Sequence, residues 1–205
     1  MKEEKVKPGN GLYRVNEIFY SLQGEGRWTG RASIFIRFAG CNLNCPFCDT
    51  DYSEGKVMLT SQIIKALAKW KCNYVILTGG EPTLQVDEDL VIALHEHGYM
   101  LSMETNGTRR IPGGIDWITC SPKQGFLSAK AARVVLHQVQ ELKVVFDGIH
   151  PVKDYGIMAF FYYIQPCDTG DPEKNKVIIQ KAVEFIKKNP GWQLSLQTHK
   201  ILDIK

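Results

Sequence analysis

Residues 40–50 read GCNLNCPFCDT and contain three cysteines, Cys41, Cys45 and Cys48, in the spacing C-x3-C-x2-C. Three thiolates this close in sequence cannot all pair with one another as disulfides, but they can bind one metal centre. Three is one fewer than the four thiolates that complete a [4Fe–4S] cluster or a structural zinc site. The spacing therefore predicts a cluster with one iron left open for a reactant.

Two other interpretations of this stretch remain open. Free cysteines pack like small apolar side chains, so the three can simply be core residues. Structural zinc needs a fourth ligand, and Cys72, Cys120 and Cys167 each stand alone, with no second C-x2-C pair in the chain. A lone histidine can still complete a zinc site.

Length and composition are those of a globular chain with one core. It has 205 residues, of which 44% are hydrophobic and 23% charged, and a net charge of +3. This length suits one sizeable core, and so small a charge gives no reason to expect nucleic-acid binding. The first residues are charged, and no apolar run reaches the length of a signal-peptide core or a membrane span. We expect a single domain over residues 1–205, in the cytoplasm, with cysteines that are thiols or metal ligands.

Short β-branched or aromatic runs alternate with amphipathic segments, which predicts an α/β fold. Helices are expected at residues 61–70, 88–98 and 172–189. Strand–helix–strand order gives a mostly parallel sheet with right-handed crossovers. Because a complete eight-unit barrel needs about 250 residues, we predict a shortened, partial (open) β/α barrel. The expected strands are residues 13–20, 33–38, 74–78, 99–104, 117–119, 142–146 and 159–164.

Five of the expected strands are followed by tips rich in polar residues or glycine. In parallel α/β architectures, ligands bind at the C-terminal ends of the strands. A single tip is explained at least as well by an ordinary turn, but five tips on one rim predict a single site. The tips are Cys41 and residues 79–82 (GGEP), 104–107 (ETNG), 121–123 (SPK) and 165–168 (QPCD).

The cysteine stretch, with the aromatic Phe47 before its last cysteine, resembles the signature of the radical S-adenosylmethionine (radical SAM) superfamily. Residues 79–82 resemble a second motif of that superfamily, which holds the amino group of S-adenosylmethionine (SAM). Two glycines let a ligand approach the backbone closely, and Glu81 offers a carboxylate to an ammonium group. The resemblance implies a radical SAM barrel, SAM as cofactor, and a [4Fe–4S] cluster on Cys41, Cys45 and Cys48.

Further motifs narrow the resemblance to the family of 7-carboxy-7-deazaguanine synthases. The likeness extends from about residue 13 to the last residue. It implies a radical SAM lyase that converts 6-carboxy-5,6,7,8-tetrahydropterin to 7-carboxy-7-deazaguanine with loss of ammonia, for queuosine or archaeosine in tRNA. It also implies a homodimer and a flavodoxin or ferredoxin as reductant, without direct contact with nucleic acid or a membrane. The motifs are residues 22–26 (LQGEG), Arg37, and residues 48–50 (CDT), 104–107, 121–123, 165–166 (QP) and 197–200 (QTHK).

The same resemblance assigns roles to single residues. Arg37 and His199 are expected on the substrate carboxylate and Glu104 on the ring nitrogens or amine, as the catalytic residues. Thr50 is the expected ligand of Mg²⁺, an ion that takes oxygen ligands. The pterin pocket is expected to contain Leu22, Gln23, Gly24, Glu25, Arg37, Thr78, Glu104, His199 and Lys205. SAM is expected to contact Phe47, Cys48, Asp49, Gly80, Glu81, Ser121, Pro122, Lys123, Gln165 and Asp168. No role is assigned to Lys56, Cys72, Cys120 or Cys167.

Simpler explanations exist for several of these residues. Arg37 lies in the apolar run IFIRF, where an unpaired charge is costly, and this favours a functional role. His199 taken alone is more often an ordinary histidine, and its motif brings a functional role only to about equal weight. Asp49 and Thr50 can cap a turn. Two alternatives for the whole chain also stay open. One is another small radical SAM enzyme, such as an activase that forms a glycyl radical on a partner protein, and the other is a non-enzymatic zinc or iron–sulfur module.

Overall fold

One curved sheet organises the protein. The computed structural model describes residues 11–128 and 130–205, and within them nine strands form a single sheet in the order β3-β1-β2-β4-β5-β6-β7-β8-β9. Every pairing from β2 to β9 is parallel, whereas β1 is antiparallel to both β2 and β3. The two edges, β3 and β9, do not pair with each other, so the sheet is an open barrel, as predicted. The strands are β1 (Leu12–Leu22), β2 (Ala32–Phe38), β3 (Lys56–Leu59), β4 (Tyr74–Gly79), β5 (Met100–Thr105), β6 (Trp117–Cys120), β7 (Gln138–Phe146), β8 (Met158–Pro166) and β9 (Trp192–Leu194).

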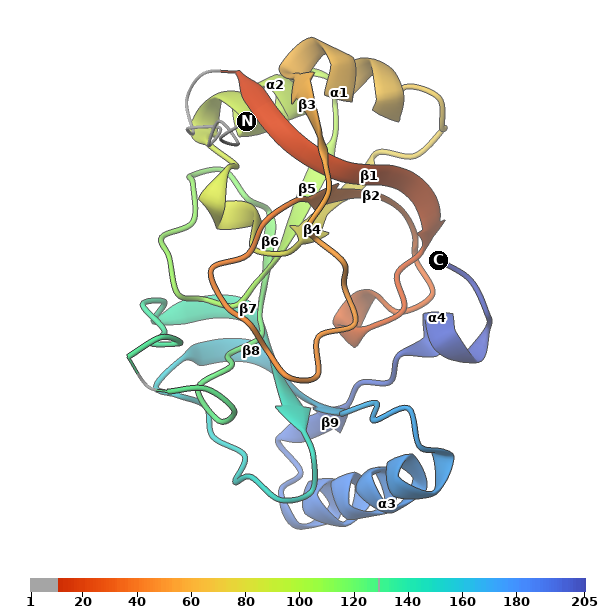
Figure 1. Cartoon of the computed structure of the whole chain (residues 1–205), viewed down its shortest axis with the longest axis vertical. Helices are drawn as coiled ribbons and strands as arrows, with labels where there is room; N and C mark the ends of the chain where they lie inside the picture. Colours follow the sequence, from red (N-terminus) through yellow and green to blue (C-terminus); the bar gives the residue numbers. More distant parts are fainter. Residues whose placement is uncertain (1–10, 129) are drawn as a thin grey trace.

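The helices cover the outside of this sheet at two ends. In Figure 1, α1 and α2 lie together at one end of the molecule and α3 lies at the other. All three expected helices are confirmed, with bounds within three residues of the prediction. Among the described residues no helix lies between β5 and β8, which confirms the short crossovers that make the barrel small. The helices are α1 (Thr60–Leu67), α2 (Glu88–Glu96), α3 (Pro172–Lys188) and α4 (Thr198–Ile201), with 3-10 turns η1 (Gly26–Trp28) and η2 (Pro82–Leu84).

Successive side chains of a strand face opposite sides of the sheet, and this alternation separates the apolar core from the cavity side. On β2, Ile34, Ile36 and Phe38 are fully buried and pack in one cluster with α1 and α2. Phe35 and Arg37 point to the opposite, concave side, because successive side chains of a strand face opposite ways. The larger apolar cluster of these strands therefore lies outside the curve of the sheet, and the inside carries a smaller cluster around Phe35 beside polar side chains such as Arg37.

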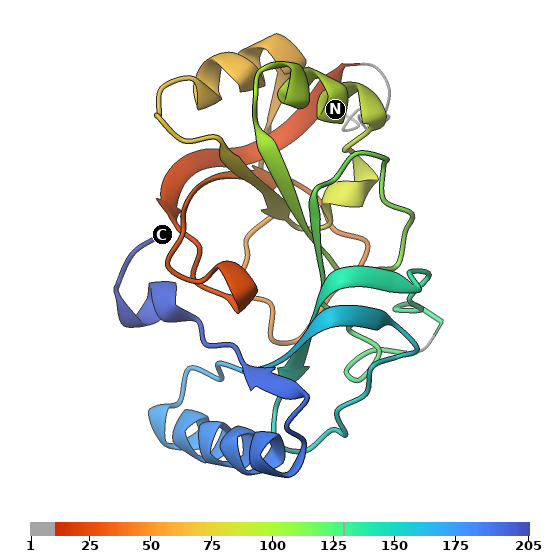
Figure 2. The ribbon, with the colours of Figure 1, turned by 180° about the vertical axis from the view of Figure 1, so that it is seen from behind.

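The turn η1 closes one end of the barrel. Its Trp28 packs edge-on against Trp117, with ring centroids 5.1 Å apart. The Arg31 guanidinium lies 3.8 Å from the ring centre of Tyr74 and 4.8 Å from that of Trp28. Stacked cations and rings fill this end, so a ligand can enter only from the other, where the parallel strands end. Figure 2 shows η1 beside the curved sheet, with α4 next to it.

Two short strands were not expected. Lys56 lies in β3 and pairs with Val15, in a segment for which we predicted no strand. β9 is three residues long and follows α3. Both are edge strands, and strands this short produce no readable alternation. Among the described helices, none is both long and apolar enough to cross a bilayer.

Candidate active site at the strand tips

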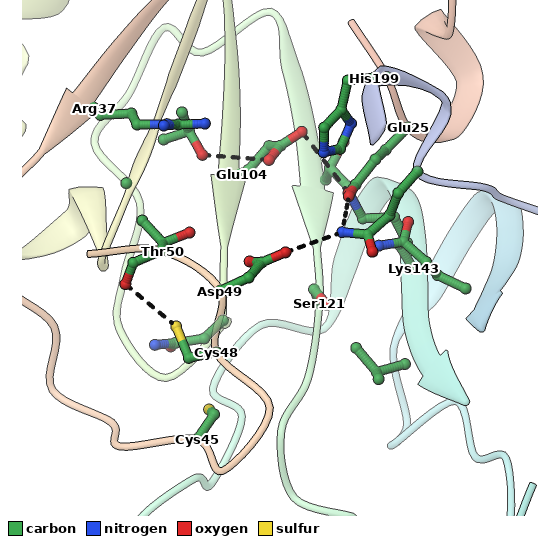
Figure 3. Close-up of a pocket in the computed structure, with 18 of the residues that line it drawn as sticks. Glu25, Arg37, Cys45, Cys48, Asp49, Thr50, Glu104, Ser121, Lys143 and His199 are labelled. Atoms are coloured by element: carbon green, nitrogen blue, oxygen red, sulfur yellow. Dashed lines mark hydrogen bonds and ion pairs between the residues drawn. The ribbon is translucent and has the colours of Figure 1, made fainter. Parts of the chain in front are cut away.

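A cavity of about 400 Å³ lies at the C-terminal ends of the parallel strands (Figure 3). The tips of β2, β4, β5, β6, β7 and β8 line it together with the cysteine loop and the C-terminal segment. Every residue predicted for the cluster, SAM, magnesium or the pterin lines this cavity, except Glu81 and Pro122. The tips that the sequence singled out therefore lie around one cavity, and their role as a single site stays a prediction.

The cysteine loop is tied to the tip of β5. The Asn106 side-chain amide donates to Asn42 Oδ1 at 3.0 Å, and Asn42 in turn donates to Thr108 Oγ1 at 2.8 Å. The Tyr52 hydroxyl donates to the Leu43 carbonyl at 3.2 Å. These bonds hold the loop open around its thiols rather than collapsed on the sheet.

The three thiols fit an iron–sulfur cluster. None of them is in a disulfide, and all line the cavity. Burial raises the pKa of the Cys41 and Cys45 thiols, so these sulfurs need a cation beside them to become thiolates. No three His, Cys, Asp or Glu side chains of the described chain converge on one ion. A cluster spreads its thiolates over several irons, so this spacing suits a cluster better than a single zinc ion.

Glycines at the tip of β4 leave the space that the cluster loop needs. Gly79 has a φ of +115°, which L side chains rarely adopt. A Cβ added to Gly80 would lie 2.0 Å from the Gly40 carbonyl oxygen and 3.1 Å from Cys41 Cβ. The β4 tip and the first cysteine thus touch along bare backbone, and any side chain there would push the cysteine away.

The position of Glu81 corrects one prediction. Its carboxylate is fully buried and does not line the cavity, where we expected it to meet an ammonium group. Its two oxygens accept from the Thr83 amide and hydroxyl, the Thr105 hydroxyl and the Asn106 amide, at 2.7–3.1 Å. Four donors satisfy the carboxylate, so Glu81 joins the β4 and β5 tips. Pro122 is also buried and away from the cavity.

A buried cation that we did not predict organises the inner wall. Lys143 on β7 is only 6% exposed and forms a very short ion pair with Glu25. Its Nζ is also 3.9 Å from Glu104 Oε1. The other contacts of Glu104 are the Gln23 amide at 2.9 Å and the Thr78 hydroxyl at 3.3 Å. Three strands, β4, β5 and β7, and the residue 22–26 loop therefore place two carboxylates and one ammonium side by side.

The contacts around Glu25 and Lys143 fix the charges of these two side chains. Burial raises the pKa of Glu25, but Lys143, the Gln197 amide and His199 outweigh it and hold that pKa at about 2. Burial lowers the pKa of Lys143, and Glu104, Glu25 and Glu141 more than reverse this, so that its pKa is raised. The wall therefore presents an ionised Glu25 carboxylate and one ammonium near neutral pH, and its carboxylate oxygens are suited to a ligand rich in N–H donors.

Arg37 and His199 lie on either side of Glu104 (Figure 3). Arg37 pairs with Glu17, with an Nη1–Oε1 distance of 2.8 Å, and its guanidinium lies 4.9 Å from the ring centre of Phe19. The His199 ring packs on Gly24, where an added Cβ would be 2.1 Å from Nδ1. Nothing in the sequence distinguishes Glu17 as the partner of Arg37.

The opposite wall carries an acidic pair bridged by a lysine. Lys200 Nζ lies 2.8 Å from Asp49 Oδ2 and 2.9 Å from Asp168 Oδ2. The Gly170 amide, Lys200 and Asn175 lower the pKa of Asp168 to about 2. Burial raises the pKa of Asp49, but Lys200 and Gln197 outweigh it, so the net change is a lower pKa.

Sequence reasoning missed Lys143 although a signal for it was present. Lys143 lies in the apolar run LKVVF, the same situation that singled out Arg37. Gln197 and Lys200 belonged to a quoted motif but were given no role. Cys167 also lines the cavity, whereas Lys56, Cys72 and Cys120 do not.

Comparisons with known proteins agree with this geometry. The family model of the Radical SAM superfamily matches residues 35–126. A 7-carboxy-7-deazaguanine synthase from Bacteroides thetaiotaomicron is 44% identical over 195 residues, covering 95% of this chain and 100% of that protein. Its counterpart from Bradyrhizobium diazoefficiens is 40% identical, covering 94% and 99% of the two chains.

A solved structure shows the same fold. The crystal structure of QueE from Escherichia coli superposes with a TM-score of 0.64 at 22% sequence identity, covering 92% of this chain and 95% of that one. Since near-full-length relatives are well above 30% identical, the chain belongs to the family of 7-carboxy-7-deazaguanine synthases, within the radical SAM superfamily.

Proposed function

We propose that this protein converts 6-carboxy-5,6,7,8-tetrahydropterin to 7-carboxy-7-deazaguanine with release of ammonia. The supporting observation is that one cavity is lined both by the cysteine loop and by a wall of paired charges. The near-complete alignment with synthases of that name supports the same reaction. The product would serve the synthesis of queuosine or archaeosine.

Membership of the radical SAM superfamily implies a [4Fe–4S] cluster and SAM. In our proposal Cys41, Cys45 and Cys48 hold the cluster. When bound and reduced, the cluster and SAM would together supply the chemistry for abstracting a hydrogen atom from the pterin. The chain would hold SAM with the Gly80 backbone and with six side chains that line the same cavity. These are Phe47, Asp49, Ser121, Lys123, Gln165 and Asp168.

The remaining charges suit a pterin that carries a carboxylate. Arg37 would bind that carboxylate, because a guanidinium offers two parallel N–H donors, and His199 would assist it from the opposite side. The Glu25 and Glu104 carboxylates would accept hydrogen bonds from the amino and ring N–H groups. Placement is the main contribution of the chain, since reacting atoms must lie within about 3–3.5 Å of each other. Leu22, Gln23, Gly24, Thr78 and Lys205 would complete the pocket.

In the proposed function Thr50 would bind Mg²⁺. Thr50 lines the cavity between the cysteine loop and Arg37. A hydroxyl is a suitable ligand for Mg²⁺, which keeps several waters and takes further oxygens from the substrate. In this position the ion would polarise the substrate carboxylate.

The remaining parts of the proposal come from the family. We expect one domain, a homodimer, and reduction by flavodoxin or ferredoxin in the cytoplasm, where thiols stay reduced. A glycyl-radical activase or a non-enzymatic metal module would not need a wall of buried carboxylates facing the thiols.

The decisive test is turnover of the reconstituted protein. Anaerobic cluster reconstitution would be followed by incubation with SAM, Mg²⁺, dithionite and 6-carboxy-5,6,7,8-tetrahydropterin, and products would be identified by mass. We expect the deazaguanine and one ammonia per turnover, and neither from Cys45→Ala. SAM cleavage without deazaguanine would refute the proposed substrate, and no SAM cleavage at all would favour the non-enzymatic module.

A further inference from the structure

The C-terminal turn, which we define as residues 197–200, contacts the pterin side of the cavity through two of its residues. The Thr198 amide and hydroxyl both donate to the Gly24 carbonyl, each at 2.9 Å. The neighbouring His199 packs its ring directly on Gly24. These contacts fix the turn against the residue 22–26 loop, so His199 cannot move without disturbing that loop.

The other two residues of the turn contact the opposite wall. Lys200 bridges Asp49, which follows the last cysteine, and Asp168, which follows β8. Gln197 bridges the two walls directly, because its side-chain amide donates to Glu25 at 3.0 Å and to Asp49 at 3.3 Å. One turn of four residues therefore holds a carboxylate from each wall.

Within the proposed function, the two walls bind different molecules. Gly24, Glu25 and His199 belong to the pterin side, whereas Asp49 and Asp168 belong to the SAM side. Residues 198–201 form a single helical turn. His199 and Lys200 are neighbours in this turn, so their side chains are attached to the same short piece of backbone. A ligand that fixes His199 therefore also fixes Lys200, and through it both aspartates.

We infer that the C-terminal turn couples the binding of SAM to the binding of the pterin, with Lys200 and Gln197 as the positioning residues. This inference rests on the proposed function. Coupling between two sites is reciprocal, so each ligand must raise the affinity for the other by the same factor. Coupling factors are typically about 5- to 150-fold. Such coupling would raise the fraction of SAM-bound protein that also contains the substrate.

The test measures a ratio of affinities rather than turnover. Equilibrium dissociation constants for SAM are measured on cluster-loaded, unreduced protein, with and without saturating pterin, and the reciprocal titration is done for the pterin. We expect a factor of about 10 in the wild type, within the usual range. In Lys200→Met the factor should fall to within about twofold of unity.

Two further variants separate coupling from simple binding. Gln197→Ala leaves every charge in place and should also lower the factor. Lys187→Met is the matched control, because Lys187 forms a lysine–carboxylate pair of 2.9 Å with Glu184 on the remote helix α3. It should keep the wild-type factor.

The outcomes that overturn the inference are specific. If Lys200→Met weakens SAM binding but leaves the coupling factor unchanged, Lys200 is only a binding residue. A wild type that forms deazaguanine but binds its two ligands independently also overturns the inference, and leaves the proposed function intact. The proposed function itself fails on the turnover assay, when the wild type forms no deazaguanine.

Discussion

Lys143→Met is expected to destabilise the protein more than any other single change at the inner wall. Methionine keeps a flexible side chain of similar length and removes the ammonium group. Lys143 is 6% exposed and its partner Glu25 is 15% exposed, so the change leaves a carboxylate buried without its cation. Breaking a buried ion pair by removing one partner costs about 3–5 kcal/mol. For a chain of this length, that lowers the Tm by roughly 6–20 °C.

The double variant Glu25→Gln/Lys143→Met tests the physical reason. Replacing both charges removes the Glu25 carboxylate that Lys143→Met alone would leave without its ion-pair partner, and removing both partners of a buried pair is often neutral for stability. We therefore expect the double variant to recover most of the lost Tm. Thermal unfolding would be followed by calorimetry on anaerobic, cluster-loaded protein, with Lys187→Met as a control for loss of one positive charge. If Lys143→Met unfolds within about 2 °C of the wild type, which corresponds to less than about 1 kcal/mol, the pair is not buried as described.

Substrate affinity should behave differently from stability. In the double variant Glu25 can no longer accept as an ionised carboxylate, and a hydrogen bond to a charged group contributes about 1.5–3 kcal/mol. The dissociation constant of the pterin should therefore rise roughly 10- to 150-fold even where the Tm recovers. Recovery of both properties together would mean that this wall does not contact the substrate.

Three smaller changes test other parts of the site. Gly80→Ala places a Cβ 2.0 Å from the Gly40 carbonyl oxygen, so the cysteine loop must shift. The iron and sulfide content after reconstitution should therefore fall below about half of the wild-type value. Full loading would contradict the close contact. Glu81→Gln replaces one of two acceptor oxygens with a donor and should destabilise the fold by about 1–3 kcal/mol in urea unfolding, with no specific loss of SAM affinity. Because the pKa of Glu25 is lowered to about 2, its ionised form stabilises the fold fully above its ordinary pKa of 4.5, and this contribution is lost as the pH falls toward 2. The decline in Tm below about pH 4.5 should accordingly be shallower in Glu25→Gln than in the wild type, and equal slopes would argue against the lowered pKa.

The parts of the fold that could be read from the sequence are those with a repeating pattern. The parallel strands and their polar tips follow from alternation and from the rule that ligands bind at strand ends. The first half of β7 was missed: the strand begins at Gln138, whereas we predicted residue 142. Polar side chains occur on both faces of this first half, so it shows no apolar–polar alternation. β3 and β9 are set by their neighbours in the sheet and leave no pattern of their own.

The site was less predictable where a side chain had two possible partners. Glu81 stands in a motif beside the cavity, yet two of its four donors are Thr105 at the end of β5 and Asn106 directly after it, which lie 24 and 25 positions along the chain. Lys143 could have been found, since a charge inside an apolar strand must be paired. Its partners could not, because Glu25 is 118 positions away and only the curvature of the sheet brings the two together.

The long-range bonds of the C-terminal turn also have a consequence for the order in which the site is made. The cysteine loop is supported by residues up to Thr108, with Asn42 and Asn106 only 64 positions apart. Thr198 is 174 positions from Gly24, and Lys205 is 184 positions from Ser21, whose hydroxyl donates to its carbonyl. During synthesis from the N-terminus, the metal-binding half is therefore complete long before the segment that covers its mouth leaves the ribosome. The bonds that support the cysteine loop can therefore form before residues 198–205 are available to line the cavity beside it.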